Sequence, residues 1–258
     1  MALAAFQAVG SDVASVTTTL ALVAPTTAND DVILALICSG DNVAPTLPAG
    51  FTLVQGFNNT IAQRQTVAWK RAAVGDSAAT FNFTVAGTTT TYGVLITYRG
   101  ALVVGSPIGT SSNSPNLLSD NITFASLTPF PTSLVVALGV YGLSGCAAGV
   151  MSPNTDPVFT SRLQTNTATG TTAALYIQDG PTDGAATGAL NLPTTSTVDA
   201  INSGVLLEIL AGTDPDADAS GGASAPKYPA IIRVKPLSTS RKLTAGYPRT
   251  RGSPSDPT

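Results

Sequence analysis

Short apolar runs bounded by Gly, Pro, Asn and Asp recur along the first 212 residues, and almost none has the periodicity of a helix. Thr and Val, whose β-branched side chains favour the surface of a sheet, are common in these runs. The clearest strand-like runs are Ser15–Val23, Asp31–Cys38, Phe51–Gln55, Gln65–Arg71, Ala79–Val85 and Tyr92–Arg99. Many short strands joined by turns predict an all-β fold, a sandwich or a jelly roll.

Two of these runs alternate between apolar and polar residues, which predicts one face turned toward a core. In one run Val67 and Trp69 point the same way, and in another Phe81, Phe83 and Val85 form the inward set. The run VILALIC is instead continuously apolar. It predicts a strand that is covered on both faces.

An internal repeat organises the chain. Four segments of residues 1–101 match four segments of residues 102–212 in the same order. The pairs are DVILALIC with SLVVALGV at an offset of 102 residues, VAWKR with ALYIQ and ATFNFT with ATGALN at 107, and GVLITYRGA with GVLLEILAG at 111. We therefore expect two similar β-sandwich or jelly-roll-like units, residues 1–101 and 102–212, packed together. The alternative is that the halves interleave into one larger two-sheet domain.

Residues 213–258 differ from the rest of the chain in composition. They are rich in Pro, Gly and Ser and lack apolar periodicity, so we expect an extended arm that becomes ordered only on a partner surface. The run Ala230–Val234 could add a strand to the edge of a neighbour's sheet. The candidate assembly residues of the arm are Lys227, Tyr228, Ile231, Ile232, Arg233, Val234, Lys235, Arg241, Lys242, Tyr247, Arg249 and Arg251.

The formal net charge of −3 is distributed unevenly over the 258 residues. Residues 1–212 contain five basic and eleven acidic side chains, a charge of −6, whereas residues 213–258 contain seven basic and four acidic ones, a charge of +3. A body so poor in Lys and Arg offers no footprint for nucleic acid.

The chain contains no histidine, which removes the commonest general base and the commonest metal ligand. Ser144, in YGLSGC, therefore lacks the base that a nucleophilic serine needs. Cys38 and Cys146 match no zinc spacing, and we expect buried free thiols rather than a disulfide. We predict no catalytic, cofactor-binding or metal-binding residue and no enzyme activity.

Two groups of carboxylates match functional sites only in part. The alternating DPDAD run at 214–218 lacks the Gly and the bidentate Glu of a calcium loop, so we interpret it as an acidic linker. Asp30 and Asp31 are adjacent at a turn, whereas glycoside hydrolysis needs two carboxylates across a cleft. Glu208, the only glutamate, lies inside an apolar strand, and we expect it to face solvent or an adjacent subunit.

Five aromatic residues could line a carbohydrate-binding face: Trp69, Tyr92, Tyr98, Tyr141 and Tyr176. Trp69 and Tyr176 occupy matching positions in the repeat, at an offset of 107. This match favours a role in the core over stacking on a sugar.

The N-terminal sequence MALAAFQAVGSDVAS has no basic region, and polar residues break its apolar stretch early. It does not predict a signal peptide. No segment approaches the roughly 20 apolar residues that cross a bilayer as a helix. We therefore expect synthesis in a host cytoplasm and no membrane partner.

The first half of the chain resembles a β-sandwich family of phage and prophage structural proteins over residues 31–101. The elements that carry the resemblance are the apolar strand Val32–Cys38, the Pro-x-Gly-aromatic-Thr element Pro48–Thr52, the aromatic-Lys-Arg strand Trp69–Arg71 and the Tyr-Arg-Gly ending Tyr98–Gly100. The second half lacks the Pro-x-Gly-aromatic-Thr element and the Tyr-Arg-Gly ending. The resemblance implies a structural role in the capsid shell or the tail of a virion and supplies no catalytic residue.

The sequence therefore predicts a bacteriophage virion structural protein. The favoured hypothesis is a capsid decoration, or cement, protein attached through its C-terminal arm and its sheet edges, with other virion proteins and further copies of itself as partners. The first alternative is a tail, baseplate or receptor-binding component, for which a host surface glycan is a candidate partner. The second is a non-catalytic carbohydrate-binding module.

Overall fold

The computed structural model describes residues 3–40, 43–59, 63–86, 90–142, 151–152, 157–165, 174–195 and 200–212. These residues form fifteen strands and no helix, which confirms the all-β prediction. All fifteen strands belong to one compact unit, Met1–Ser220. The strands are β1 (Ala5–Val9), β2 (Val13–Ser15), β3 (Thr19–Val23), β4 (Val32–Ser39), β5 (Thr52–Asn59), β6 (Gln63–Arg71), β7 (Thr80–Thr84), β8 (Thr91–Arg99), β9 (Ile108–Ser119), β10 (Asn121–Phe124), β11 (Leu134–Tyr141), β12 (Thr160–Gln164), β13 (Ala174–Pro181), β14 (Leu190–Pro193) and β15 (Ala200–Ile209).

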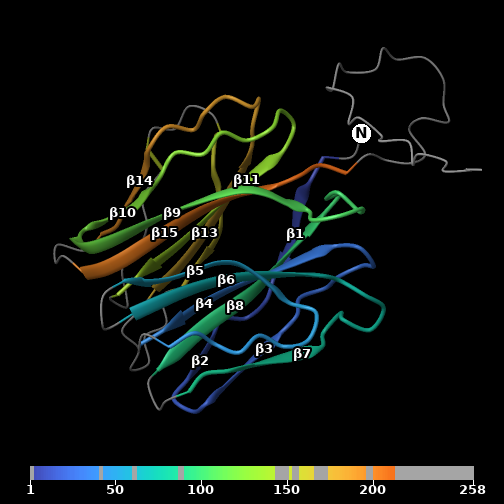
Figure 1. Ribbon diagram of the computed structural model, residues 1–258, viewed down its shortest axis with the longest axis vertical. Helices are drawn as coiled ribbons and strands as arrows, with labels where there is room; N and C mark the ends of the chain where they lie inside the picture. The colour runs from blue at the N-terminus through green and yellow to red at the C-terminus, as the bar shows by residue number, and fades with distance from the viewer. Residues whose placement is uncertain are drawn as a thin grey trace, which may run out of the picture. The chain divides into compact units, whose positions relative to one another are not determined.

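Two large antiparallel sheets and two small ones make up this unit (Figure 1). Sheet I has the strand order β1-β8-β4-β6-β5, with β2 also paired to β8, and sheet II has the order β12-β13-β11-β15-β9. Strands β3 and β7 form cover I, which packs on sheet I, and β10 and β14 form cover II, which packs on sheet II. The strands of residues 1–101 lie in sheet I and cover I, and the later strands lie in sheet II and cover II.

Three apolar cores lie between these layers. The central core joins the two large sheets and contains Val32, Leu34, Leu36, Val67, Val94 and Ile96 of sheet I together with Leu134, Val136, Leu138, Ile177, Val205 and Leu207 of sheet II. The core under cover I contains Leu20, Leu22, Ile33, Ala35, Ile37, Phe83 and Leu95. The core under cover II contains Ile122, Phe124, Val135, Tyr141, Tyr176, Leu190, Leu192 and Leu206.

Strand β4 faces two of these cores at once. Leu34 and Leu36 lie in the central core, whereas Ile33, Ala35 and Ile37 lie under cover I. All five side chains are fully buried. The prediction that VILALIC is covered on both faces is therefore confirmed.

The predicted strand Ser15–Val23 is interrupted. Strand β2 ends at Ser15 in sheet I and β3 begins at Thr19 in cover I. Residues 16–18 bend between them, and the Ser15 hydroxyl donates a hydrogen bond across the bend to the carbonyl oxygen of Thr19, over 2.9 Å. The prediction of one continuous strand is wrong because the chain changes layers here.

The two large sheets share a register as well as a strand order. Leu34 on β4 pairs with Trp69 on β6, and Val136 on β11, 102 residues further on, pairs with Asp179 on β13. Trp69 thus corresponds to Asp179, at an offset of 110, and the predicted match with Tyr176 at 107 is wrong by three residues. Because an odd shift moves a side chain to the opposite face, Tyr176 lies under cover II, whereas Trp69 packs against the central core.

Local irregularities also fall at matching places. The register between β5 and β6 shifts at Val54, and the register between β12 and β13 shifts at Arg162. Asp30 and Thr132, 102 residues apart, both have a positive φ, of 68° and 70°. Each precedes the central strand of its sheet, so the same turn leads into β4 and β11.

Part of the Pro-x-Gly-aromatic-Thr element has a counterpart in the second half. Thr160 pairs with Asp179 as Thr52 pairs with Trp69, so Phe159 and Thr160 correspond to the aromatic-Thr pair of the element. The glycine that precedes the aromatic residue is absent there. A sequence comparison that requires this glycine misses the match.

The chain segments that leave β8 and β15 pair with each other. The N–H of Gly212 donates to the carbonyl oxygen of Gly100 over 2.7 Å, and the N–H of Leu102 donates to that of Leu210 over 2.8 Å. This pairing joins the linker between the halves to the end of the second half. We call this end of the unit the linker end.

Candidate interaction surface

The predicted assembly arm lies outside the described residues. This applies to Lys227, Tyr228, Ile231, Ile232, Arg233, Val234, Lys235, Arg241, Lys242, Tyr247, Arg249 and Arg251, to the DPDAD run, and to Ser144 and Cys146. The candidate surface is therefore built from the body, residues 3–212.

The aromatic residues considered for sugar binding are core residues. Tyr92, Tyr98, Tyr141 and Tyr176 are all buried. Trp69 is half-buried against the central core, and the guanidinium of Arg71 lies 6.0 Å from the centre of its ring. These five residues do not form an exposed aromatic platform.

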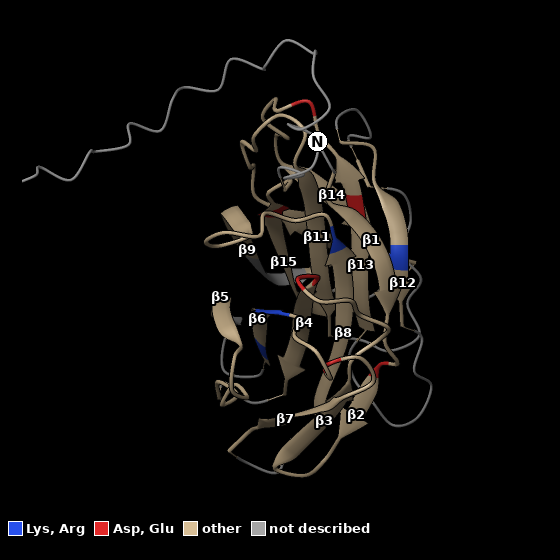
Figure 2. Ribbon diagram, turned by 90° about the vertical axis from the view of Figure 1, so that its right-hand side faces the viewer, with Lys and Arg blue, Asp and Glu red and all other residues tan. Residues whose placement is uncertain are grey.

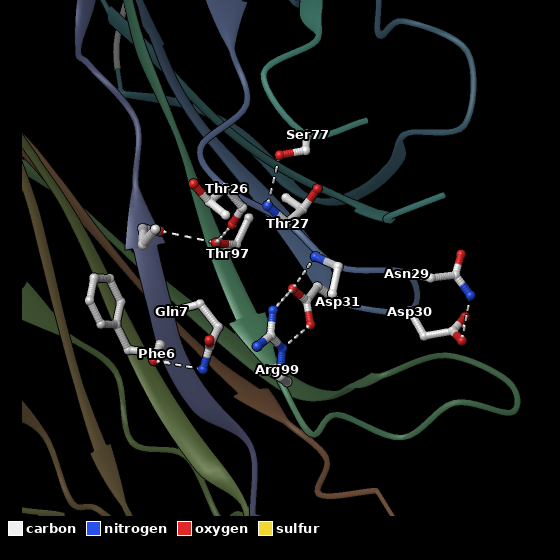
Figure 3. Close-up of polar contacts among 12 residues, drawn as sticks. Phe6, Gln7, Thr26, Thr27, Asn29, Asp30, Asp31, Ser77, Thr97 and Arg99 are labelled. Carbon is white, nitrogen blue, oxygen red and sulfur yellow. Dashed lines mark hydrogen bonds and ion pairs between the residues drawn. The ribbon is translucent and has the colours of Figure 1, made fainter. Parts of the chain in front are cut away.

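Asp31 is occupied by an ion pair and a turn (Figure 3). Arg99 donates to both of its carboxylate oxygens over 2.9 Å, and the N–H of Ala28 donates to Oδ2 over 2.7 Å. The neighbouring Asp30 carboxylate accepts instead from the amide of Asn29. The two adjacent carboxylates thus have separate partners and do not form a paired acid and base.

Glu208 is fully buried, which corrects the expectation that it faces solvent or a subunit. Its Oε1 accepts from the N–H of Phe130 over 2.6 Å, and its Oε2 accepts from the N–H and the hydroxyl of Thr110. The carboxylate supplies acceptors to amides of two chain segments that lie beside β15. Such partners cannot be read from the apolar strand in which Glu208 stands.

A third carboxylate, Asp179, is buried where β12 and β13 approach β1. Arg162 donates to both of its oxygens over 2.9–3.0 Å, and the guanidinium stacks 4.6 Å from the ring centre of Phe6. Phe6 in turn contacts Tyr98 edge to face. Burial, and then the negative charge of Asp179, raise the pKa of Tyr98 well above its ordinary value.

Cys38 is a free, buried thiol, as expected. The side-chain amide of Gln63 donates to its sulfur over 3.1 Å. Burial raises the thiol pKa to about 12, more than this hydrogen bond lowers it. Among the described residues, no group of three or more Cys, Asp or Glu side chains could hold a metal ion.

Four of the five edge strands of the large sheets, β1, β5, β9 and β12, carry register irregularities, whereas the short strand β2, which pairs only with β8, does not. The irregularities occur at Gln7 in β1, at Val54 in β5, at Arg162 in β12 and at two places in the pairing of β9 with β15. The pairs formed by the central strands are continuous. Such irregularities bend an edge strand and limit the addition of a further strand from another molecule.

Three exposed valines lie at the linker end, and we call them the valine tip. Val74 is 93% exposed in the turn between β6 and β7, and Val103 and Val104 are 47% and 83% exposed in the linker between the halves. Single exposed apolar residues are ordinary, but these three lie on loops whose backbones are held by side-chain hydrogen bonds, and we take them as the candidate contact surface.

Arg71, the last residue of β6 and three residues before Val74, holds the linker that carries Val103 and Val104. Its Nη2 donates to the carbonyl oxygens of Leu102 and Gly105, over 2.6 and 3.3 Å, and its Nη1 donates to that of Asp30 over 3.3 Å. The linker that carries Val103 and Val104 therefore bends over the guanidinium. Two carbonyl acceptors of the linker on one charged group fix it more firmly than one would.

A second contact fixes the turn that carries Val74. Asp76 forms an ion pair with Lys70 and accepts from the N–H of Ala73 over 2.7 Å. Burial raises the pKa of Asp76, but these hydrogen bonds and the charge of Lys70 outweigh it and lower the pKa below 3.8. The valine side chains are thus exposed on loops whose backbones are fixed by hydrogen bonds from Arg71 and to Asp76.

Sequence reasoning did not identify the valine tip. The signal was present as a valine immediately before the glycine of a short turn, in AAVGD and in VVGS. A valine in such a turn has no strand neighbours to cover it.

The rest of the described surface carries few charges. Most of the ribbon in Figure 2 is neither basic nor acidic. Lys70, Arg99 and Arg162 are ion-paired, and Arg71 is occupied by carbonyl oxygens. The described residues contain no helix of the length and apolarity that crossing a membrane requires.

Comparison of the chain with protein-family models, with curated proteins and with solved structures found no match.

Proposed function

We propose that this chain is a structural protein of a bacteriophage virion, a capsid decoration or cement protein that holds neighbouring subunits through the C-terminal arm and through its body. The phage assignment rests on the resemblance of residues 31–101. The observation that carries the binding role is the valine tip, because its three side chains are exposed on loops that Arg71 and Asp76 hold in place.

The use of the buried charges supports a structural role. Asp31, Asp179 and Glu208 accept hydrogen bonds from arginines or backbone amides. Their carboxylates stabilise turns and edges, which is what a protein that is assembled once requires. In contacts between proteins, aromatic and apolar groups that exclude water supply most of the affinity.

We also propose that the two halves are copies of one jelly-roll-like sandwich unit. The shared strand order and register and the matching turns at Asp30 and Thr132 support this. Within this proposal the sheet edges contribute less to attachment than the valine tip, since their long edge strands β1, β5, β9 and β12 carry irregularities and β2 has only three residues.

The two alternatives remain distinct proposals. A tail, baseplate or receptor-binding component would use the same body on a different particle surface. A carbohydrate-binding module is less favoured, because the aromatic side chains that could stack on a sugar are in the cores.

The test compares particle binding by the full chain and by matched variants. Phage shells and tails, purified separately without this protein, are mixed with the full chain, with a chain ending at Gly212 and with Val74→Ser/Val104→Ser, and bound protein is measured after sedimentation. We expect the full chain to saturate shells and both variants to bind them several-fold more weakly. Val158→Ser is the control, because Val158 is 57% exposed and lies outside the tip.

Each contrary result has a defined meaning. Binding to tails alone would replace the decoration hypothesis with the tail hypothesis. No binding to either particle, together with affinity for sugars on a glycan array, would support the carbohydrate-binding module.

A further inference from the structure

The two large sheets meet along two sides, and the same structural positions carry different chemistry on each. On one side β1 of sheet I approaches β12 of sheet II, where Arg162 stacks on Phe6. On the other side β5 approaches β9, where the amide of Gln55 donates to the hydroxyl of Ser111 over 2.9 Å. Figure 2 shows β1 and β12 on one side of the unit and β5 and β9 on the other. We call the first side the charged seam. We call the second the apolar seam, because apolar residues replace the ion pair there, although Gln55 also hydrogen-bonds with Ser111 and Asn113 across it.

The charged seam is formed by Phe6, Tyr98, Arg162 and Asp179. Phe6 pairs with Tyr98 between β1 and β8, and Arg162 forms its ion pair with Asp179 between β12 and β13. The side chain of Asp179 is 1% exposed and that of Arg162 is 28% exposed. The carboxylate is therefore removed from water, whereas the guanidinium is partly exposed and has an aromatic face as its other neighbour.

The corresponding positions of the apolar seam hold no charge. Ile108 pairs with Ile209 as Phe6 pairs with Tyr98, and Val54 and Trp69 correspond to the ion pair. All four of these apolar residues lie in or against the central core. The shared register thus places a buried ion pair on one seam and a Val–Trp pair on the other.

A buried polar contact between the sheets is equally one-sided. Gln65 on β6 is fully buried; its amide donates to the carbonyl oxygen of Leu138, and its Oε1 accepts from the hydroxyl of Ser203 over 2.6 Å. The position of Gln65 is held by Leu175 in the second half, and that of Ser203 is held by Tyr92 in the first. The contact exists once, between unlike halves.

These asymmetries decide which halves fit together. If the second half paired with the second half of another copy, Arg162 and Asp179 would face Ile108 and Ile209, and the guanidinium would lose its aromatic face. If the first half paired with itself, Gln65 would face Tyr92 and lose the serine hydroxyl. The Arg162–Asp179 ion pair lies within one half and would persist, but the guanidinium would lose its aromatic face and the buried Gln65 amide its hydroxyl partner, and each loss is unfavourable.

We propose that the charged seam and the Gln65–Ser203 contact make each half recognise the other half of the chain and exclude the like half of a second copy. The two halves have the same fold and strand order, so shape alone discriminates poorly between correct and exchanged pairing. Specificity of this kind requires an element that penalises the wrong partner. The interaction surface is the inner face of each large sheet, and the excluded partner is a second copy of this chain.

The experiment refolds the full chain from urea at high protein concentration and measures dimers that survive dilution under native conditions. Association through the arm or the valine tip reverses on dilution, whereas durable dimers contain halves paired between chains. The wild-type level measures exchange of unlike halves, which keeps both contacts, and a rise above that level in a variant measures pairing of like halves. The test variant, Arg162→Met/Asp179→Leu, replaces the ion pair by apolar side chains of similar volume. We expect its fraction of durable dimer to rise several-fold over that of the wild type, and refolding of two dye-labelled populations together to place both dyes in one dimer.

A second variant and a control keep the outcome interpretable. Gln65→Leu/Ser203→Ala removes the other contact and should raise the durable dimer in the same direction, even if the first variant folds poorly. Val54→Met/Ile108→Val changes the apolar seam and should leave the fraction at the wild-type level. Dimer fractions equal to wild type in both test variants, with normal circular dichroism, would overturn the proposal.

Discussion

Thr97 and Glu208 occupy matching positions on β8 and β15, and each holds the segment that leads to the central strand of its sheet. The Thr97 hydroxyl is shared between the carbonyl oxygens of Ala8, at 3.3 Å, and Thr26, at 3.4 Å, as Figure 3 shows. Glu208 accepts from the N–H of Phe130 over 2.6 Å. A neutral donor meets a carbonyl group in one half, and a carboxylate meets an amide in the other. The same structural task is thus performed by groups of opposite hydrogen-bonding character.

Replacing Glu208 by alanine should destabilise the body markedly. The N–H groups of Phe130 and Thr110 would lose their acceptor, and an unsatisfied buried donor costs about 1–3 kcal/mol. We expect a loss of about 2–4 kcal/mol in the free energy of unfolding, measured by urea denaturation. Glu208→Gln keeps one acceptor oxygen and should lose less; equal losses in the two variants would contradict this assignment.

Alanine at Gly204 should be tolerated worse than alanine at Gly93, the matching position in sheet I. A Cβ at Gly204 would lie 2.4 Å from the backbone oxygen of Thr123, whereas a Cβ at Gly93 would lie 2.8 Å from the end of the Leu20 side chain. A side chain can move aside more easily than a backbone. We expect Gly204→Ala to cost about 1–3 kcal/mol, Gly93→Ala to cost less, and thermal unfolding of the two variants to rank them in this order.

Glycine at position 132 should stabilise the protein. Thr132 has a φ of 70°, a conformation that is unfavourable for a β-branched residue. We expect Thr132→Gly to raise the free energy of unfolding by about 0.5–1 kcal/mol. Thr128→Gly is the control, because the positive-φ residues do not include Thr128, and there glycine should destabilise. A gain of similar size at both positions would show that φ is not the cause.

The contribution of Asp76 to stability should disappear in acid. Because hydrogen bonds from Lys70 and Ala73 lower the pKa of Asp76 below 3.8 in the folded chain, folding favours the ionised carboxylate. That contribution is present in full above the unfolded pKa and is lost as the pH falls through the lower, folded value. The difference in the free energy of unfolding between wild type and Asp76→Asn should therefore be largest near neutral pH and shrink as the pH falls below 3.8, as measured by urea denaturation at several pH values. A difference that is constant with pH would refute a lowered pKa for Asp76 in the folded chain.

Cys38 should resist thiol reagents in the native protein. Its thiol is buried, and burial raises its pKa to about 12, so almost no thiolate exists at neutral pH. In a Cys146→Ser variant, we expect labelling by a chromogenic disulfide reagent only at the rate of unfolding. Rapid labelling without denaturant would show that the sulfur is accessible.

The sequence predicts the layers of this fold better than the positions within them. The continuous apolar run of β4 and the alternation around Phe83 indicate correctly which faces are buried, because the order of apolar and polar residues along a strand determines which face is turned to the core. The alignment of Trp69 with Tyr176 fails, since short sequences rich in the same few residue types can be aligned three residues out of register. Only the backbone pairing of Trp69 with Thr52, and of Asp179 with Thr160, fixes that register.

The candidate surface is less predictable, because it depends on contacts between loops. Glu208 was expected to be exposed, and its burial follows from the amides of Thr110 and Phe130, 98 and 78 residues away in the chain. The same holds for Val104, whose presentation depends on Arg71 reaching Leu102. Neither partner is indicated by any local pattern.

The pairing of Gly212 with Gly100, and of Leu102 with Leu210, also has a mechanical consequence. Tension applied to the chain beyond Gly212 acts first on these hydrogen bonds, which join the end of the second half to the linker that follows the first. The pull is therefore divided between both large sheets from the outset instead of peeling β15 away alone. A tether attached here would transmit force into both large sheets at once.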